Sequence, residues 1–177
     1  LQFQILCPTH EGENGVNALN QKTQELLGIK LRDKNSLKRY VGMPIMIEKN
    51  DYGVNLFNGD IGIFLPDQKQ NNELVAWFKK SDGTYRSVSS SRLPPYKLAY
   101  AMTVHRSQGS EYDKVMIILP NHPSEILSRH LLYVACSRAS KKVTLIGSRK
   151  IIESCINLFF LPEWHNLDIL RLLFLII

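Results

Sequence analysis

Polar side chains that could bind a ligand crowd into one short stretch of the chain, between Thr103 and Asp113. Hydroxyl, imidazole, amide and carboxylate groups come from Thr103, His105, Ser107, Gln108, Ser110, Glu111 and Asp113. Gly109 stands among them and lets backbone amides come close to a ligand. Such a stretch is too polar to bury and too compact to serve as a linker. It indicates a binding site, with a plain polar loop between two strands as the alternative.

The elements on either side would place this stretch at the rim of a sheet. Leu98 to Val104 forms an apolar run before it, and Lys114 to Leu119 forms another after it. A buried strand that ends in a polar turn and is followed by a second strand puts ligand groups at the carboxyl edge of an α/β sheet. We therefore expect an α/β domain whose function lies where the first of these strands stops.

The α/β pattern also covers both ends of the chain. Gln2 to Cys7 predicts a buried strand ended by Pro8, and apolar residues at helical spacing predict a helix over 14–27 that ends at Gly28. The later part predicts a strand over 115–119, a helix from an N-cap at Ser124 to about Ala139, a strand over 143–147 and a helix over 149–158. The run 131–136 is apolar nearly all round, which predicts a buried helix.

Residues 40–95 have a different pattern, with short alternating runs separated by turn residues. Strands are predicted at Pro44–Glu48, Asp60–Leu65, Leu74–Phe78 and Tyr85–Val88, with turns at Asn58-Gly59 and Asp82-Gly83. Short strands at this spacing predict a small barrel or meander. Because the α/β pattern resumes at Leu98, we expect this block to be an insertion in the parent domain.

Two stretches resemble motifs of a known helicase family. Thr103-Val-His-Arg-Ser-Gln-Gly-Ser-Glu-Tyr-Asp113 closely resembles motif V of superfamily 1 helicases, in the form found in the RecD-like branch, the alpha subunit of exodeoxyribonuclease V. Leu132-Tyr-Val-Ala-Cys-Ser-Arg-Ala-Ser140 is similar to motif VI of the same family. The resemblance spans roughly residues 2–152. It implies a RecA-like second motor domain over 1–39 and 96–157, with a small Src-homology-like β-barrel inserted over 40–95.

The resemblance also implies roles for single residues. Arg138 matches the motif VI arginine that contacts the γ-phosphate of ATP, although an arginine that caps a helix end is the simpler alternative. Gly109 and Glu111 would lie near the nucleotide, with Glu111 at the ribose. The DNA backbone would be contacted by Thr103, His105 and Ser107, joined by Arg106 and Gln108. Lysines follow at 141 and 142, where the family often has arginines. A lysine supplies positive charge but cannot donate the two parallel hydrogen bonds that a guanidinium donates to a phosphate.

Part of the chemistry of ATP hydrolysis is absent from the sequence. It contains no Gly-x-x-x-x-Gly-Lys-Ser/Thr loop and no Asp-Glu pair. We therefore expect a missing amino-terminal lobe to hold ATP and Mg²⁺, and this chain alone to be inactive.

By resemblance, the complete enzyme is an ATP-dependent helicase that moves 5′ to 3′ on single-stranded DNA. Its candidate partners are the beta and gamma subunits of exodeoxyribonuclease V, in double-strand break repair and recombination. The alternatives are a non-catalytic DNA-binding or interaction remnant, and a related helicase of conjugation or transposition.

Length and composition limit the number of domains, the kind of partner and the role of the cysteines. At 177 residues the chain fits one ordinary domain, or one with a small insertion. Twenty-two Lys and Arg against 16 Asp and Glu give a net charge of +6, which favours polyanionic partners. The three isolated cysteines, Cys7, Cys136 and Cys155, indicate neither a disulfide framework nor a metal cluster, and they favour the cytoplasm.

The two ends of the chain are unusual. It begins with Leu1 rather than Met, so we expect a piece of a longer protein. Residues 158–177 end in an apolar run far shorter than the roughly 20 residues that a membrane span needs, so no membrane contact is expected. This tail could be a packed end, an aberrant reading-frame end or a surface that a partner covers.

Overall fold

The computed structural model describes residues 2–29, 39–80 and 82–157. Residues 30–38, which the predicted motor domain includes, and the tail over 158–177 therefore lie outside the described residues. The chain divides into two compact units, with boundaries after Leu19 and after Tyr100. We call the described parts of 1–19 and 101–157 the parallel unit, and those of 20–100 the antiparallel unit. In the part that is described, no helix is long and apolar enough to cross a membrane.

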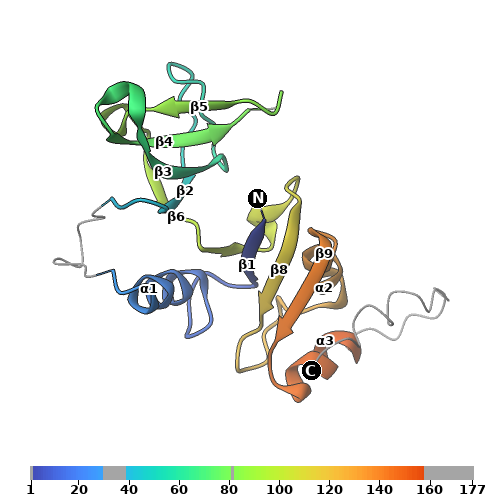
Figure 1. The fold of residues 1–177 in the computed structure, drawn as a ribbon. Helices are drawn as coiled ribbons and strands as arrows, with labels where there is room; N and C mark the ends of the chain where they lie inside the picture. The colour runs from blue at the N-terminus through green and yellow to red at the C-terminus, as the bar shows by residue number, and fades with distance from the viewer. Residues whose placement is uncertain (1, 30–38, 81, 158–177) are drawn as a thin grey trace. The chain divides into compact units, whose positions relative to one another are not determined.

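The parallel unit is built on a four-stranded sheet in the order β7-β1-β8-β9 (Figure 1). The strands are β1 (Phe3–Cys7), β7 (Ala101–Thr103), β8 (Tyr112–Ile118) and β9 (Ala139–Ile146). Every pairing between them is parallel. Cys7 pairs with Thr103, so β1 and β7 end at the same level. The predicted α/β class with a parallel sheet is confirmed.

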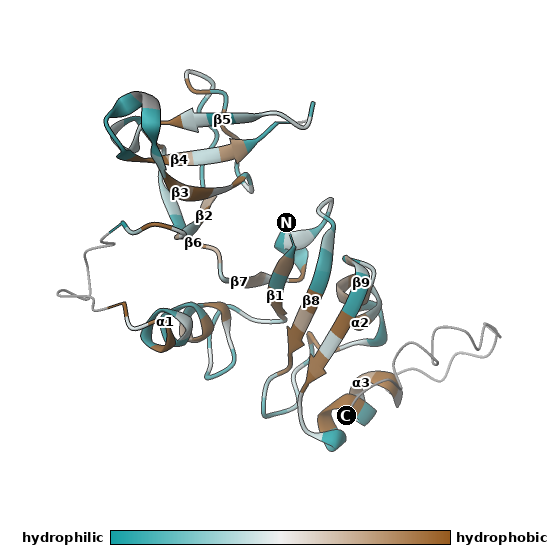
Figure 2. Cartoon of the chain, in the orientation of Figure 1, coloured by the Kyte–Doolittle hydropathy of each residue, from teal (hydrophilic) through white to brown (hydrophobic). Residues whose placement is uncertain are grey.

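Apolar side chains explain why these segments form a sheet core. The strands are hydrophobic along much of their length (Figure 2), and Leu6 and Ile117 are fully buried. Helix α1 (Val16–Leu26) follows β1 and packs Val16 and Leu19 against Cys7. The helix ends at Leu26, one residue before the predicted end, and Gly28 has the positive φ of 68° that was expected just beyond a helix end. A last helix, α3 (Arg149–Asn157), also confirms the prediction.

Helix α2 (Arg129–Cys136) is shorter than predicted at both ends. Its N-cap is Ser128, whose hydroxyl accepts a hydrogen bond from the Leu131 amide at 3.1 Å, so the predicted cap at Ser124 is wrong. Ser124 instead begins a turn in which its carbonyl accepts from the amide of Leu127. The expectation of a wholly buried helix is also wrong, because Tyr133 is 56% exposed.

Strand β9 begins at Ala139, where the sequence predicted the end of a helix. Residues 140–142 are polar, so no apolar run in the sequence marks the first half of this strand. Pairing with β8 stabilises it: Ala139 lies opposite Tyr112, and the amide of Tyr112 donates to the carbonyl of Arg138 at 2.8 Å. Lys141 also forms a surface ion pair with Asp113 at 2.8 Å.

The antiparallel unit contains a five-stranded sheet in the order β5-β4-β3-β2-β6. The strands are β2 (Pro44–Ile47), β3 (Ile61–Asp67), β4 (Glu73–Lys79), β5 (Tyr85–Val88) and β6 (Tyr96–Leu98), with short 3-10 turns η1 (Gln68–Gln70) and η2 (Ser90–Arg92). The first four confirm the predicted strands. Strand β6 was not predicted, because the expected insertion ended at residue 95 and residues 96–98 were assigned to the parent domain; β6 pairs with β2 instead.

One face of this second sheet forms its own core. Fully buried side chains in this core include Ile45 and Phe64 from the sheet and Leu56 from the segment between β2 and β3. The predicted turns are present at Gly59 and Gly83, which have φ values of 98° and 82°. Asp82 accepts hydrogen bonds from the amide and hydroxyl of Thr84 at 2.8 and 2.6 Å, and these bonds hold the hairpin between β4 and β5.

The buried thiol of Cys7 predicts a loss of stability at high pH. Burial raises the pKa of Cys7 from its ordinary value of 9.0 to about 12. The neutral thiol therefore stabilises the fold below pH 9, and this contribution is lost as the pH rises from about 9 to about 12. The free energy of unfolding should fall less steeply over this range for Cys7→Ala than for the wild type. Parallel curves for the two proteins would show that Cys7 does not contribute.

Candidate functional site

The parallel sheet has two edges, and the predicted site residues are divided between them. At the carboxyl edge, β1 and β7 end together at Cys7 and Thr103. At the amino edge, β8 and β9 begin together at Tyr112 and Ala139. Residues 104–111 connect the two edges, because they follow β7 and lead into β8. The polar stretch therefore extends along the sheet instead of forming one turn at its rim, as the sequence had suggested.

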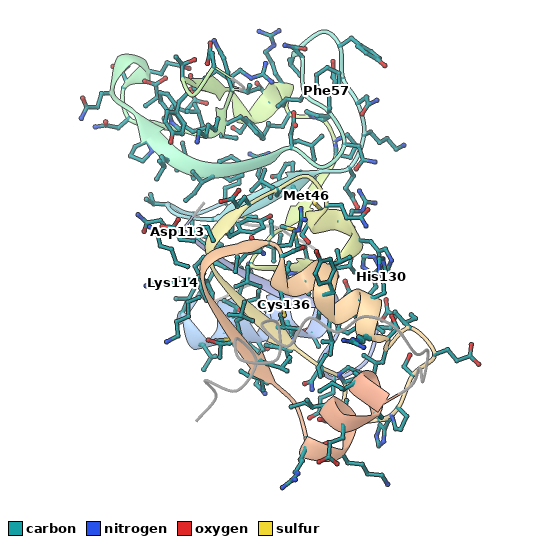
Figure 3. All side chains as sticks on the ribbon, turned by 90° about the vertical axis from the view of Figure 1, so that its right-hand side faces the viewer. Met46, Phe57, Asp113, Lys114, His130 and Cys136 are labelled. Carbon is teal, nitrogen blue, oxygen red and sulfur yellow. The ribbon has the colours of Figure 1, made fainter. Side chains whose placement is uncertain are left out.

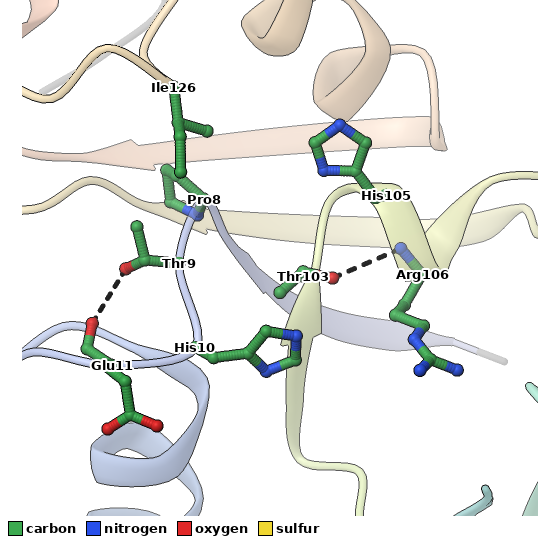
Figure 4. A pocket seen from close by; sticks show the side chains of 8 residues that line it. All are labelled: Pro8, Thr9, His10, Glu11, Thr103, His105, Arg106 and Ile126. Carbon is green, nitrogen blue, oxygen red and sulfur yellow. Dashed lines mark hydrogen bonds between the residues drawn. The ribbon is translucent and has the colours of Figure 1, made fainter.

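The carboxyl edge carries an open hollow of about 680 Å³, which we call the first hollow (Figure 4). Its lining residues lie at or just after the ends of β1 and β7, with one residue from the segment before α2; they are Pro8, Thr9, His10, Glu11, Thr103, His105, Arg106 and Ile126. Thr103 is buried, and its hydroxyl accepts a hydrogen bond from the amide of Arg106 at 3.3 Å. The side chains of His105 and Arg106 are exposed. The structure thus brings three predicted DNA-binding residues into one hollow.

A second hollow of about 290 Å³ shares His105 and Ile126 with the first. It is lined by Val104, His105, Gln108, Ile126, Ser128, His130, Leu131 and Val134. Gln108, another predicted DNA-binding residue, is exposed here. His130 projects from α2 (Figure 3). The two hollows therefore meet at the turn η3 (His105–Ser107).

Ser107 differs from the other predicted DNA-binding residues. Its side chain is fully buried, and its hydroxyl donates to the carbonyl of Val104 at 2.7 Å. The amide of Ser107 donates to the same carbonyl at 3.2 Å. In this conformation Ser107 holds η3 from inside and presents no side-chain atom to either hollow.

Two histidines in the hollows were not predicted as ligand-binding residues. His10 follows the end of β1, and only the neighbouring position of β1 and β7 in the sheet places it beside His105. His130 lies in the first turn of a helix whose start was predicted four residues too early, at Ser124 instead of Ser128. Among the described residues, no three His, Cys, Asp or Glu side chains are grouped as a metal site would require.

The amino edge brings Arg138 close to Glu111. The Arg138 side chain donates from Nη1 to the carbonyl of Ser110 at 3.2 Å and from Nε to the carbonyl of Val134 at 3.3 Å. Nη2 donates to the Ser137 hydroxyl at 3.2 Å. The bond to Val134 is what a helix-capping arginine makes, whereas the bond to Ser110 ties the side chain to the residue before Glu111. An arginine has five N–H groups, so these contacts leave donors for a ligand.

Gly109, Glu111 and Tyr112 complete the amino edge. Gly109 has a φ of 83°, a conformation that residues with a side chain rarely adopt. Glu111 is exposed. Tyr112 is buried; burial raises the pKa of its hydroxyl, while a hydrogen bond with Ser110 and the Arg138 charge act in the opposite direction. This edge therefore brings the Arg138 guanidinium and the exposed Glu111 carboxylate to the same part of the sheet.

Comparison with known sequences identifies related proteins. The UvrD-like helicase C-terminal domain matches residues 98–146. The RecBCD enzyme subunit RecD of Buchnera aphidicola is 36% identical over 162 residues, which cover 87% of this chain and 26% of that protein. The ATP-dependent RecD2 DNA helicase of Deinococcus radiodurans is 32% identical over 150 residues, with coverages of 82% and 20%. The chain thus spans about a quarter, or less, of the length of these relatives.

Comparison with solved structures supports the fold. A Pif1 helicase from Bacteroides, in complex with ADP-AlF3 and ssDNA, has a TM-score of 0.52 and 23% identity, covering 96% of this chain and 44% of that one. Pif1 helicase from Candida albicans has a TM-score of 0.53 and 21% identity, with coverages of 89% and 49%. At these identities the likeness concerns the α/β fold.

Proposed function

Because this chain belongs to the RecD-like helicases, we propose that it is the carboxyl-terminal motor lobe of an ATP-dependent DNA helicase. The observation that carries the proposal is the path of residues 104–111. This segment forms part of both hollows at the carboxyl edge and contacts Arg138 through Ser110 at the amino edge. A single segment can therefore transmit a change at one edge to the other.

The amino edge is the proposed nucleotide side. Arg138 is positioned to approach the γ-phosphate of an ATP that another lobe holds with Mg²⁺, and Gly109 and Glu111 are proposed to border the same nucleotide. A guanidinium that meets charge developing on a phosphoryl group lowers the barrier to its transfer. The bond from Arg138 to Ser110 supports this assignment, since it aligns the arginine with the proposed nucleotide-binding loop.

The carboxyl edge is the proposed DNA side. Thr103, His105, Arg106 and Gln108 are proposed to contact the phosphates of single-stranded DNA, and Ser107 to contribute by holding their turn in place. Hydroxyl, amide and cationic groups directed at phosphates carry no base information, so binding should be independent of sequence.

We further propose that strands β2 to β6 form the Src-homology-like barrel inserted in the motor lobe. Five antiparallel strands around a separate apolar core, with the turn η2 before the last strand, support this assignment. The parent motor domain would then comprise the parallel unit and the helix that follows β1. The proposed boundary lies after Leu98, three residues beyond the position indicated by the sequence.

The proposed role of the complete protein is 5′ to 3′ translocation on single-stranded DNA during double-strand break repair and recombination, with the beta and gamma subunits of exodeoxyribonuclease V as partners. Two relatives bear on this choice: one is a RecBCD subunit and another is a DNA helicase described without such partners. Co-purification with the two subunits would distinguish the two cases. A coding sequence without a Walker A loop would favour the alternative of a DNA-binding remnant.

DNA binding should depend strongly on salt. Cationic groups that neutralise phosphates release counterions, so the affinity for a fluorescent oligothymidylate should fall on the order of tenfold or more between about 50 and 200 mM salt. Fluorescence anisotropy at a series of salt concentrations measures this slope. An affinity that stays constant over the range would contradict the proposed phosphate contacts.

A further inference from the structure

Three oxygen atoms of the protein hold the guanidinium of Arg138, and one of them is the hydroxyl of the preceding residue, Ser137. Nε donates to the carbonyl of Val134 at 3.3 Å, Nη1 to the carbonyl of Ser110 at 3.2 Å and Nη2 to the Ser137 hydroxyl at 3.2 Å. The two carbonyls are main-chain groups that any residue at those positions would supply. Among the described residues, the Ser137 hydroxyl is therefore the one acceptor of Arg138 that a substitution can remove.

The Ser137 hydroxyl is itself fixed in its orientation. It donates to the carbonyl of Val134 at 2.9 Å, and the same carbonyl accepts from Nε of Arg138. A hydroxyl has one proton to donate and lone pairs to accept with, so once its proton is used on Val134 it meets Nη2 as an acceptor. The Ser137 hydroxyl, the Val134 carbonyl and the guanidinium thus form a closed ring of hydrogen bonds at the carboxyl end of α2.

This ring determines which N–H groups of Arg138 remain available. A guanidinium has five N–H groups, and the three bonds use one on each nitrogen, so one N–H remains on Nη1 and one on Nη2. Two N–H groups on neighbouring nitrogens can bind two oxygens of one phosphate at the same time. Without the Ser137 hydroxyl, Nη2 would lose its acceptor and the guanidinium could turn away from this orientation.

We propose that Ser137 is a positioning residue for Arg138, whose hydroxyl orients the guanidinium so that its two remaining N–H groups meet a phosphoryl group together. The inference rests on the proposed function and adds to it a residue that acts through Arg138 without touching the nucleotide. A small displacement of a group that stabilises developing charge lowers the reaction rate more than it weakens ground-state binding. Loss of the Ser137 hydroxyl should therefore reduce ATP turnover and leave nucleotide affinity largely unchanged.

The test measures ATP turnover and the affinity for a fluorescent ATP analogue in the complete protein carrying Ser137→Ala. We expect turnover to fall about tenfold while the affinity stays within about twofold of the wild type. Ser137→Thr keeps a hydroxyl that can bond to the carbonyl of Val134, so its turnover should be close to that of the wild type. In the Arg138→Ala background, Ser137→Ala should have little further effect, because residues that act as a unit are not additive.

Ser154→Ala is the matched control for the loss of a helical serine hydroxyl. The Ser154 hydroxyl donates to the carbonyl of Ile151 at 2.7 Å, with the same spacing along the chain as Ser137 and Val134. Within the described part of the chain, it accepts no hydrogen bond from an arginine. Turnover of Ser154→Ala should equal that of the wild type, so the control separates loss of a bond to the helix backbone from loss of the contact with Arg138.

The possible results separate this inference from the proposed function. If Arg138→Ala turns ATP over at the normal rate, the proposed function fails, and the role of Ser137 fails with it. If Arg138→Ala is impaired and Ser137→Ala is not, the role of Ser137 is wrong while the proposed function stands. The role is also overturned if Ser137→Ala lowers turnover by the same factor with and without Arg138, if Ser137→Thr is as impaired as Ser137→Ala, or if Ser154→Ala lowers turnover equally.

Discussion

In the complete protein, the proposed function predicts that Arg138→Ala lowers the rate of ATP turnover on the order of 10³-fold, with nucleotide binding largely retained. The arginine would act mainly on charge that develops during phosphoryl transfer, so its loss affects the turnover rate more than the affinity. Steady-state ATPase assays and equilibrium binding of a fluorescent ATP analogue measure the two quantities separately.

Two further variants make this result specific. Arg138→Lys retains a positive charge but loses the planar guanidinium and its paired N–H donors, so its turnover should lie between those of the wild type and Arg138→Ala. Arg149→Ala removes an exposed arginine whose ion pair with Glu153 lies on the surface, and turnover should be unchanged. Thermal unfolding must accompany the assays, because Arg138 also bonds to the carbonyls of Val134 and Ser110. Normal turnover in a folded Arg138→Ala protein would leave Arg138 as a helix cap only.

Phe64→Ala should reduce the stability of the antiparallel unit by about 3–5 kcal/mol. Phe64 is fully buried in the core of this unit, where its ring meets Tyr96 edge to face with ring centres 5.9 Å apart. The guanidinium carbon of Arg39 also lies 5.9 Å from the ring centre. Alanine would remove these contacts and leave a cavity that backbone hydrogen bonds of the sheet prevent from closing.

The neighbouring residue on the same strand provides the control. Ile63 precedes Phe64 in β3 but lies on the other face and is 38% exposed. Ile63→Ala should therefore cost about 1 kcal/mol or less. Urea denaturation followed by circular dichroism gives the free energy of unfolding for both variants. Equal losses for the two substitutions would mean that Phe64 does not anchor a separate core.

Local patterns predicted the fold where burial alone determines the structure. The apolar run before Pro8 and the helical spacing after it correctly indicated β1 and α1, and paired turn residues correctly indicated the hairpin at Gly83. The errors have identifiable causes. β9 begins in a polar run that is stabilised by pairing with β8, and Ser124 and Ser128 are both suitable caps, so only the tertiary fold selects between them.

The candidate site could be predicted only in part, for a similar reason. The sequence indicated the stretch containing His105 and Glu111, but not that these residues belong to opposite edges of a sheet. That separation depends on which strands are neighbours, and a strand does not specify its neighbour through its own residues. His10 was missed because the position that makes it relevant is set by the pairing of β1 with β7.

The pairing of β1 with β7 also constrains the order in which the chain can fold. Cys7 and Met102 are in contact although 95 positions separate them, and the whole antiparallel unit lies between. Closing so long a loop is entropically costly while the intervening chain is unfolded. Strand β2 pairs with β6, so the folded insertion holds Ile45 and Leu98 together and shortens the effective loop. Early folding of the insertion should therefore accelerate assembly of the parallel sheet, and slow folding of the insertion should leave β1 exposed to mispairing during synthesis.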